Sequence, residues 1–252
     1  MTARKRALVT GGHAGLGLAF CRALTAAGYV VTALDRSAPD SAVPWTHRVC
    51  DLGDRPQLDA ALHHLCAGEP FDIVILNAGV SSTGRFEKIP VEAHRRLITV
   101  NVEAPMVLCA ALAGNGALAK GGKVLFVSSL AHMTGYPGAA SYAASKDAVA
   151  VYAKSIRRSF RRALGVHVAC AFPGPLRTDH AERHAPKGAK ADRRMDPEEA
   201  ARRIFAAMRW RRSVIVPGVR AKLFAVLGRL FPKLVTRAMR RIVFDRLERE
   251  VW

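Results

Sequence analysis

The chain is poor in acidic residues, in paired cysteines and in long apolar runs. Its 252 residues include 39 Lys and Arg but only 20 Asp and Glu, which gives a formal net charge of +19. The five cysteines are scattered and form no Cys-x-x-Cys pair, so neither a disulfide framework nor a metal site is expected. No run approaches the roughly eighteen uncharged apolar residues of a membrane span.

Hydrophobic residues, in contrast, make up 50% of the chain, which is enough for the core of one domain of ordinary size. The basic start of the chain is followed by a short apolar stretch that ends in Thr10-Gly-Gly. We interpret this stretch as a first strand rather than a signal peptide, and we therefore expect a cytoplasmic protein.

Apolar strand-like runs alternate with helical patterns along the chain. Most runs are short, continuous and rich in Val, Ile or Leu, as in strands that are covered on both faces. The strand candidates are Arg6–Thr10, Val30–Leu34, Thr46–Val49, Ile73–Leu76, Val124–Val127, Val166–Ala171 and Val214–Val216. The helical candidates are Gly15–Ala27, Arg55–Cys66, Val91–Leu112, Tyr142–Ala163 and Pro197–Met208. This alternation predicts an α/β fold of the Rossmann type, a doubly wound parallel sheet of about seven strands with helices on both faces.

A glycine-rich turn connects the first strand to the first helix. Gly11, Gly15 and Gly17, with Leu16 between them, allow a tight turn and a close approach of the backbone to a pyrophosphate, and the helix N-terminus adds free N–H groups. Asp35 ends the second strand eighteen residues after Gly17, where a carboxylate can accept hydrogen bonds from ribose hydroxyls. The pattern predicts a dinucleotide site.

Two further strand ends belong to the same predicted site. Asp51 and Leu52 close the third strand, where a side chain can meet the adenine amino group. N-capping of the following helix explains Asp51 nearly as well. Asn77, Ala78 and Gly79 close the fourth strand, where small residues let the sheet edge pack against the adenosine.

Tyr142 and Lys146 stand four residues apart, on one face of a predicted helix. A phenol has an ordinary pKa near 10. An adjacent ammonium group and an oxidised nicotinamide ring stabilise its anion, so we expect a lowered pKa and proton transfer near neutral pH. Ser129 lies thirteen residues before the tyrosine and ends the fifth strand, whereas its neighbour Ser128 is interpreted as a turn residue.

These motifs occur in the order of the short-chain dehydrogenase/reductase family, which the chain resembles over residues 5–217. The matching motifs are Thr10-Gly-x-x-x-Gly-x-Gly17, Asn77-Ala-Gly79, Ser129, Tyr142-x-x-x-Lys146 and Pro173-Gly-Pro-Leu-Arg-Thr178. The chain departs from the family at Leu76, where a second asparagine is frequent. It also departs at His13-Ala14, where NADP-preferring relatives often carry a basic residue just before the middle glycine.

The resemblance implies an NAD(P)-dependent oxidoreductase and a role for each matching residue. Tyr142 would be the acid/base, and Lys146 would lower its pKa and bind the nicotinamide ribose. Ser129 would orient the substrate carbonyl, and Asn101 would hold a water that leads from Lys146 to solvent. Pro173, Gly174 and Thr178 would lie at the nicotinamide carboxamide, although the turn alone would explain the proline and the glycine.

The expected substrate is a secondary alcohol or ketone, including a lipophilic one. Asp35 favours NAD over NADP because its carboxylate repels a 2′-phosphate, whereas Arg36 and His13 could pair with one. Candidates for the substrate side are Ser81, Ser82, His132, Met133, Tyr136 and the segment 178–195, with His132 interpreted as a loop residue rather than a second acid. That segment is polar and shows no period, so we expect a mobile loop.

A second hypothesis is a non-catalytic NAD(P)-binding sensor or scaffold at a membrane or an acidic partner, but the complete Ser129, Tyr142 and Lys146 set argues against it. The positive charge attracts polyanions or forms a solvated face. No nucleic-acid-binding motif is found, so specific binding is not expected. We expect a homodimer or homotetramer, because the helix of Tyr142 continues through the apolar residues Ala148, Val149, Val151, Tyr152 and Ile156.

The predicted organisation is a dinucleotide-binding catalytic domain, residues 1–217, followed by a basic, amphipathic, helical extension, residues 218–252. Residues 201–252 contain fourteen Lys and Arg against three Asp and Glu. Apolar residues of the extension recur at three- and four-residue steps among basic ones: Leu223, Phe224, Leu227, Leu230, Phe231, Leu234, Val235, Met239, Ile242 and Val243. This pattern predicts docking on an anionic membrane surface or on a lipophilic substrate. Packing on the protein itself, or on a neighbouring subunit, is an equal alternative.

Overall fold

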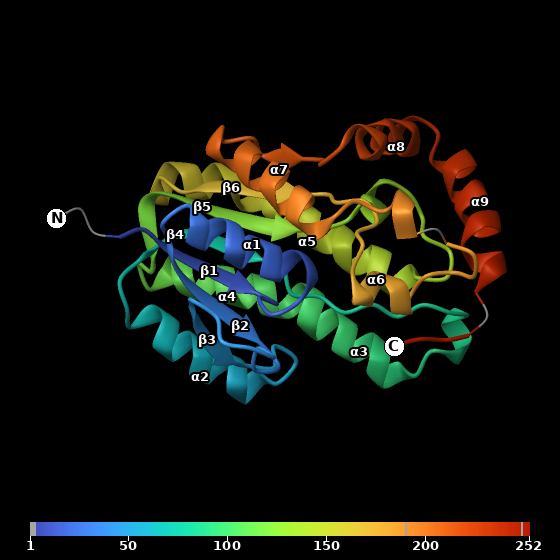
Figure 1. Ribbon diagram of the computed structural model, residues 1–252. Helices are drawn as coiled ribbons and strands as arrows, with labels where there is room; N and C mark the ends of the chain where they lie inside the picture. The colour runs from blue at the N-terminus through green and yellow to red at the C-terminus, as the bar shows by residue number, and fades with distance from the viewer. Residues whose placement is uncertain (1–3, 190, 248) are drawn as a thin grey trace.

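A seven-stranded parallel sheet in the order β3-β2-β1-β4-β5-β6-β7 forms the centre of the computed structural model (Figure 1). The structure describes residues 4–189, 191–247 and 249–252; the remaining residues of the predicted catalytic domain and extension lie outside it. The strands are β1 (Arg6–Thr10), β2 (Val30–Asp35), β3 (Thr46–Val49), β4 (Phe71–Leu76), β5 (Leu118–Val127), β6 (His167–Ala171) and β7 (Val214–Ile215). The predicted doubly wound fold is confirmed.

Helices cover both faces of the sheet and form two apolar layers. On one face lie α1 (Gly15–Ala26) and α7 (Pro197–Arg209); on the other lie α2 (Arg55–Cys66), α4 (Ala104–Gly114) and α5 (Ala140–Ser159). Successive strand residues point to opposite layers: Leu8 and Val74 belong to the α5 layer, whereas Val9 and Ile75 belong to the α1 layer. Both faces are therefore buried, as the continuous apolar strands predicted.

The strand order reverses between β1 and β4. The connection from β1 leads outward to β2 and β3, and the chain then returns to β4 on the other side of β1. In parallel α/β sheets a crevice opens at such a reversal, beyond the carboxyl ends of the strands. The ends of β1, β4 and β5 therefore position the candidate site.

A long central helix crosses the sheet as α3 (Val91–Ile98), a π-helical turn (Thr99–Glu103) and α4. Among the described residues, this stretch is long and apolar enough to cross a membrane by length and composition alone, although it contains Glu103 and is therefore not an uncharged apolar run. Its most apolar window has a mean hydropathy of 1.7 and is 44% buried in the fold. Core helices share this composition, so the stretch is weak evidence for a span.

The predicted loop at residues 178–195 contains helical structure that the sequence analysis missed. A short helix, α6 (Asp179–Arg183), begins where the Thr178 hydroxyl accepts a hydrogen bond from the Ala181 N–H (3.1 Å), and a 3-10 turn covers Ala191–Arg193. A helix of five residues is too short to show a period. Thr178 followed by an acidic first turn was the local signal for it.

The extension contains α8 (Val219–Leu230), α9 (Pro232–Ile242) and a 3-10 turn (Phe244–Arg246), with Pro232 at the start of α9 as predicted. The chain then returns to the loop after β4, where Thr83 and Val251 exchange two backbone hydrogen bonds of 2.8 Å. Ala221 and Phe224 pack against the α5 layer. Packing on the protein itself is thus correct for one face of the extension.

The apolar face of α5 that suggested an oligomer is mostly core. Val149 is 2% exposed, and Tyr152 and Ile156 pack against the same apolar layer. Val151 does face outward, with 53% of its surface exposed. The breadth of this apolar face therefore does not by itself indicate a subunit interface, because packing of the long helix α5 against the sheet explains most of it.

Candidate active site

The glycine turn has the backbone shape that the sequence predicted. Gly11 and Gly15 adopt left-handed conformations, with φ of +67° and +49°. A Cβ at Gly17 would lie 1.8 Å from the Gly11 carbonyl oxygen, so no other residue fits. None of the described side chains caps the N-terminus of α1, and its first N–H groups are left free for an anion. Leu16 is buried and anchors the turn in the core.

Asp35 lies beside this turn, at the end of β2. Its carboxylate accepts a hydrogen bond from the His13 N–H (3.0 Å). The His13 Nδ1 lies 2.7 Å from the Ser37 carbonyl oxygen, which can only accept, so Nδ1 carries the proton. The His13 Nε2 is buried without a hydrogen-bond partner among the described residues. Arg36 is exposed next to Asp35.

Asp51 is held by an arginine that the sequence analysis did not single out. Its two carboxylate oxygens accept hydrogen bonds from Arg96 at 3.0 and 2.9 Å, and one accepts from the Gly53 N–H. Burial acts to raise the pKa of Asp51, but these bonds hold it below its usual value. Asp54, not Asp51, caps α2 by accepting from the Gln57 N–H, so the capping alternative for Asp51 was wrong. Leu52 beside it is buried.

Hydrogen bonds join the ends of β1 and β4. The Asn77 side chain donates to the Thr10 carbonyl oxygen (3.0 Å), and the Ala78 N–H donates to the Thr10 hydroxyl (3.0 Å). Gly79 follows, and a Cβ there would lie 3.1 Å from the Lys146 Nζ and 3.3 Å from the Asn101 Oδ1. The glycine lets the cofactor-side and catalytic-side residues approach each other.

Asn101 lies in the π-helical turn and is 1% exposed. Its Oδ1 accepts from the Val80 N–H (2.8 Å), and its Nδ2 donates to the Val80 carbonyl oxygen (2.9 Å) and to the Ser145 hydroxyl (3.0 Å). Ser145, which the sequence analysis missed, lies on α5 between Tyr142 and Lys146. Asn101 therefore fixes α5 against the end of β4, and its expected water-holding role stays a prediction.

Ser129, Tyr142 and Lys146 come together as the spacing predicted. The Ser129 side chain is hydrogen-bonded to Tyr142, and the Lys146 Nζ lies 5.8 Å from the Tyr142 ring centroid. Lys146 is 4% exposed and donates to the Val127 carbonyl oxygen (3.0 Å). Ser128 instead donates to the Lys146 carbonyl oxygen (2.7 Å), which is the structural role expected of it.

With the protein groups alone the pKa of Tyr142 is raised, whereas the expected lowering assumed an oxidised nicotinamide ring as well as the ammonium group. Burial raises it, and the Ser129 hydrogen bond lowers it only in part. Burial also lowers the pKa of Lys146 to about 8. A dry site disfavours both charged forms, and the ammonium faces the tyrosine ring and the Val127 carbonyl. The protein groups alone therefore do not lower the phenol pKa.

The segment after β6 closes the site from the other side. The Pro173 carbonyl oxygen accepts from the Leu130 N–H (3.1 Å), which ties this turn to the chain after Ser129. Gly174 lies against Leu130 and the first turn of α8. A Cβ at Gly15 would lie 3.0 Å from the Thr178 methyl group, so Thr178 reaches the glycine turn. The glycine turn after β1 and the segment after β6, which lie far apart in the sequence, are thus in contact.

Two histidines lie near this site: His180 in α6 and His184 directly after the helix. The His180 and His184 rings are 4.8 Å apart, and the Thr83 hydroxyl lies 3.0 Å from the His184 Nδ1. Burial, aided by neighbouring cations, lowers the pKa of each histidine to about 4. The cations that act on His180 include Arg36 and Lys146, so α6 lies between the cofactor end and the catalytic end.

The substrate-side candidates have different environments. Ser81 is partly buried, and the Ser82 hydroxyl is buried without a partner among the described residues. His132 lies in a 3-10 turn (Leu130–Met133) and is hydrogen-bonded to Asp147. Met133 packs against Gly228 of α8. Burial raises the pKa of Tyr136, which lies near enough to Tyr142 to influence its ionisation.

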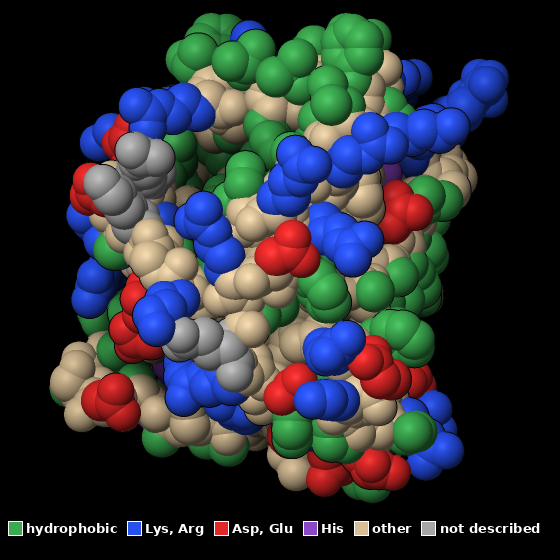
Figure 2. All heavy atoms as spheres, turned by 90° about the vertical axis from the view of Figure 1, so that its right-hand side faces the viewer, with side chains coloured by type: hydrophobic (Ala, Val, Ile, Leu, Met, Phe, Trp, Pro, Cys, Tyr) green, Lys and Arg blue, Asp and Glu red, His purple; other side chains and the backbone are tan. Residues whose placement is uncertain are grey.

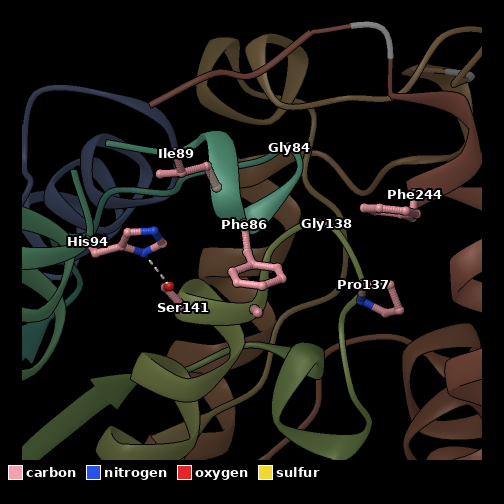
Figure 3. Close-up of a pocket in the computed structure, with 9 residues that line it drawn as sticks. Gly84, Phe86, Ile89, His94, Pro137, Gly138, Ser141 and Phe244 are labelled. Carbon is pink, nitrogen blue, oxygen red and sulfur yellow. Dashed lines mark hydrogen bonds between the residues drawn. The ribbon is translucent and has the colours of Figure 1, made fainter. Parts of the chain in front are cut away.

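An apolar pocket of about 210 Å³ is lined in part by Ser141, the residue that directly precedes Tyr142 in the chain (Figure 3). It is formed by the loop after β4, the start of α5 and the end of the extension. Its lining includes Gly84, Phe86, Ile89, Pro137, Gly138 and Phe244. At one side His94 and Ser141 are hydrogen-bonded at 2.6 Å.

Comparisons with known proteins agree with this geometry. A family model described as short chain dehydrogenase matches residues 5–188. The NADPH-dependent 3-dehydrocapnine reductase of Ornithobacterium rhinotracheale is 32% identical over 187 residues, covering 69% of this chain and 66% of that protein. A short-chain dehydrogenase from Burkholderia cenocepacia in complex with NADP has a TM-score of 0.77 at 23% identity, covering 94% and 97%. The structure of 4-hydroxyisoleucine dehydrogenase complexed with NADH has a TM-score of 0.74 at 21% identity, and the match covers 85% of this chain and 98% of that chain.

The α6 histidines predict a pH-dependent stability. Both folded pKa values, about 4, lie below the ordinary value of 6.5, so the fold favours the neutral rings. Their contribution is complete above pH 6.5 and is lost as the pH falls towards 4. We expect His180→Asn/His184→Asn to lose less thermal stability than the wild type on acidification across this window. His64→Asn, on the exposed side of α2, should behave like the wild type; parallel loss in all three proteins would contradict the assignment.

Proposed function

Because the chain belongs to the short-chain dehydrogenase family, we propose that it transfers a hydride between a nicotinamide cofactor and a secondary alcohol or ketone. The hydrogen-bonded Ser129–Tyr142 pair, with Lys146 buried on the same helix, is the observation that supports this most directly. A panel of secondary alcohols and ketones, assayed with NAD(H) and NADP(H) by nicotinamide fluorescence, tests the reaction class.

The residues present suit a dinucleotide. The uncapped N-terminus of α1 offers free N–H groups to a pyrophosphate, and Gly17 leaves no side chain in its way. Asp35 and Arg36 would meet the adenosine ribose, Asp51 the adenine, and Thr178 the nicotinamide end. When bound, the cofactor would supply or accept the hydride.

The catalytic residues would move the proton that accompanies the hydride. In reduction, the Tyr142 hydroxyl would donate a proton to the substrate oxygen while Ser129 orients that oxygen by a hydrogen bond. The buried Lys146 ammonium would stabilise the resulting phenolate by its charge. In oxidation the same groups would act in reverse. A non-catalytic sensor would require none of these three side chains, and no described feature favours that alternative.

We propose a lipophilic substrate. The pocket beside Ser141 is bounded mainly by Phe86, Ile89, Pro137 and Phe244, which suit an apolar group attached to the reacting carbon. Tyr136 and Met133 add further apolar surface on the segment between Ser129 and Tyr142. The cytoplasmic location stays a prediction.

Replacement of the catalytic tyrosine gives the most direct test. Tyr142→Phe keeps the ring but removes the transferable proton, so we expect kcat to fall by roughly 10²–10⁴ while the dinucleotide Kd stays nearly unchanged. The matched control is Tyr152→Phe, which changes a tyrosine of the same helix that packs on Phe126. Retention of more than a tenth of wild-type activity by Tyr142→Phe would contradict the assignment.

The comparisons do not support the expected preference for NAD over NADP. Relatives and structural neighbours carry NADPH, NADP or NADH in their descriptions. We propose that the preference is set by opposing charges at the end of β2. The Asp35 carboxylate would repel a 2′-phosphate, whereas the exposed Arg36 guanidinium would pair with one. His13 would join Arg36 only as an imidazolium, because the neutral ring carries its proton on Nδ1 and its Nε2 cannot donate.

This opposition makes a quantitative prediction. Asp35→Ala should raise the ratio of kcat/KM with NADP to that with NAD by roughly tenfold or more, because a charge repulsion at contact distance is removed. Arg36→Ala should lower the same ratio. Asp40→Ala, a nearby exposed carboxylate, is the control for net charge. An unchanged ratio in both Asp35→Ala and Arg36→Ala would refute the role of this strand end.

We also propose a homodimer or homotetramer, because members of the family commonly pair the helix that carries the catalytic tyrosine. In this chain the outward residue Val151 and the exposed residues Val91 and Ile98 of α3 would lie in such an interface. Static light scattering at micromolar concentration should give a multiple of the 27.3 kDa chain mass. A monomeric mass would contradict the prediction.

A further inference from the structure

The C-terminal extension presents two different faces. The inward face of α8 consists of Ala221, Phe224, Ala225 and Gly228; the first three pack against the core, and Gly228 lies against Met133 and Thr134. The Thr236 hydroxyl of α9 accepts a hydrogen bond from the Gly135 N–H (3.1 Å). The extension is therefore fixed to the segment that follows Ser129, and its outward face has a defined orientation.

The outward face of α8 is an apolar stripe. Val219, Leu223, Val226, Leu227 and Leu230 are 80%, 60%, 53%, 41% and 65% exposed. Their spacing of three, four and one residues places all five on one side of the helix. The stripe continues into α9 through Phe231 (53%), Leu234 (63%) and Ile242 (56%). We refer to these eight residues as the apolar edge.

Basic side chains flank the apolar edge. No acidic residue occurs between Pro217 and Phe244, whereas the exposed basic residues there are Arg220, Lys222, Arg229, Lys233, Arg237, Arg240 and Arg241. Figure 2 shows hydrophobic side chains gathered at the top of this face of the molecule, where Figure 1 places α8, above a row of Lys and Arg side chains. Arg240 has a nearby carboxylate, Asp245, at 3.8 Å.

We propose that the apolar edge inserts into the interface of an anionic lipid bilayer, with the flanking basic residues at the lipid headgroups. Apolar residues that are already exposed lose contact with water on insertion, and each nearby Lys or Arg gains attraction to anionic lipid. The membrane contact does not depend on the proposed reaction.

The charges select a bilayer over the other occupants of such a surface. A second copy of the chain, docked through the same edge, would bring two sets of basic residues together with no acidic residue of α8 or α9 to offset them. A nucleic acid would satisfy the charges but would leave the leucines, Phe231 and Ile242 in water. An anionic bilayer satisfies both.

The proposed contact has a consequence for substrate access. Gly228 and Thr236 hold α8 and α9 against residues 133–135, which lie between the catalytic Ser129 and Tyr142. Insertion of the edge would thus bring the substrate-side segment close to the membrane surface, where lipophilic alcohols and ketones concentrate.

Vesicle co-sedimentation tests the membrane contact without reference to activity. The full-length protein should bind vesicles of phosphatidylcholine mixed with phosphatidylglycerol, bind phosphatidylcholine alone far less, and be released by salt. The variant Leu223→Gln/Leu230→Gln/Leu234→Gln should bind at least tenfold less. Arg229→Gln/Lys233→Gln should bind roughly thirtyfold less, since each base near the surface contributes about a factor of five.

Matched variants elsewhere control for apolarity and charge. Val49→Gln/Trp210→Gln/Val214→Gln removes exposed apolar residues outside the extension and outside the proposed subunit interface, and Arg158→Gln/Arg161→Gln removes exposed bases of the α5 region. Both should bind like the wild type. The proposal is overturned if the wild type does not bind anionic vesicles, or if the edge variants and controls lose binding equally. It is also overturned if the wild type is an oligomer that does not bind lipid and light scattering shows that the edge variants are monomers, because the apolar edge would then be a subunit interface.

Discussion

The site depends on one buried side chain, the amide of Asn101, and on the three hydrogen bonds that it makes. Two go to the backbone of Val80 after β4, and one goes to Ser145 on α5. Because a buried amide must be satisfied, the two elements are held in one relative position. That position puts the Lys146 ammonium at Gly79 and the Tyr142 phenol at Ser129. The π-helical turn that carries Asn101 gives the central helix the shape to reach both.

Burial then determines the electrostatics of the site. It raises the pKa of Tyr142 and lowers that of Lys146 to about 8. In the protein alone the phenol therefore stays protonated at neutral pH, and the lysine loses its proton more easily than an exposed lysine does. The α6 histidines lie in the same dry region, and their pKa values fall for the same reason. A ligand that brings positive charge close to the tyrosine would shift this balance, which couples cofactor binding to proton transfer in the proposed reaction.

The extension has one face that packs on the α5 layer and one face that is exposed. Its inward residues, such as Phe224, complete the apolar layer over α5, and its last residues pair with Thr83 beside the site. The outward residues, such as Leu223 and Leu230, are left exposed by the same helices. One amphipathic sequence therefore serves both packing and an outward-facing function, because a helix has two sides and the core needs only one.

The sequence by itself determined the alternation of strands and helices and the glycine turn, since these follow from hydrophobic period and local spacing. The Ser129, Tyr142 and Lys146 set was identified from its resemblance to the motifs of the family. The sequence analysis missed α6, which is too short to show a period, and the Arg96–Asp51 pair, whose members are 45 residues apart. It did not show that burial raises the pKa of Tyr142 when only the protein groups act, and it left the two faces of the extension open. Only the tertiary structure decided these points, because burial and long-range contacts arise from how elements pack rather than from their local pattern.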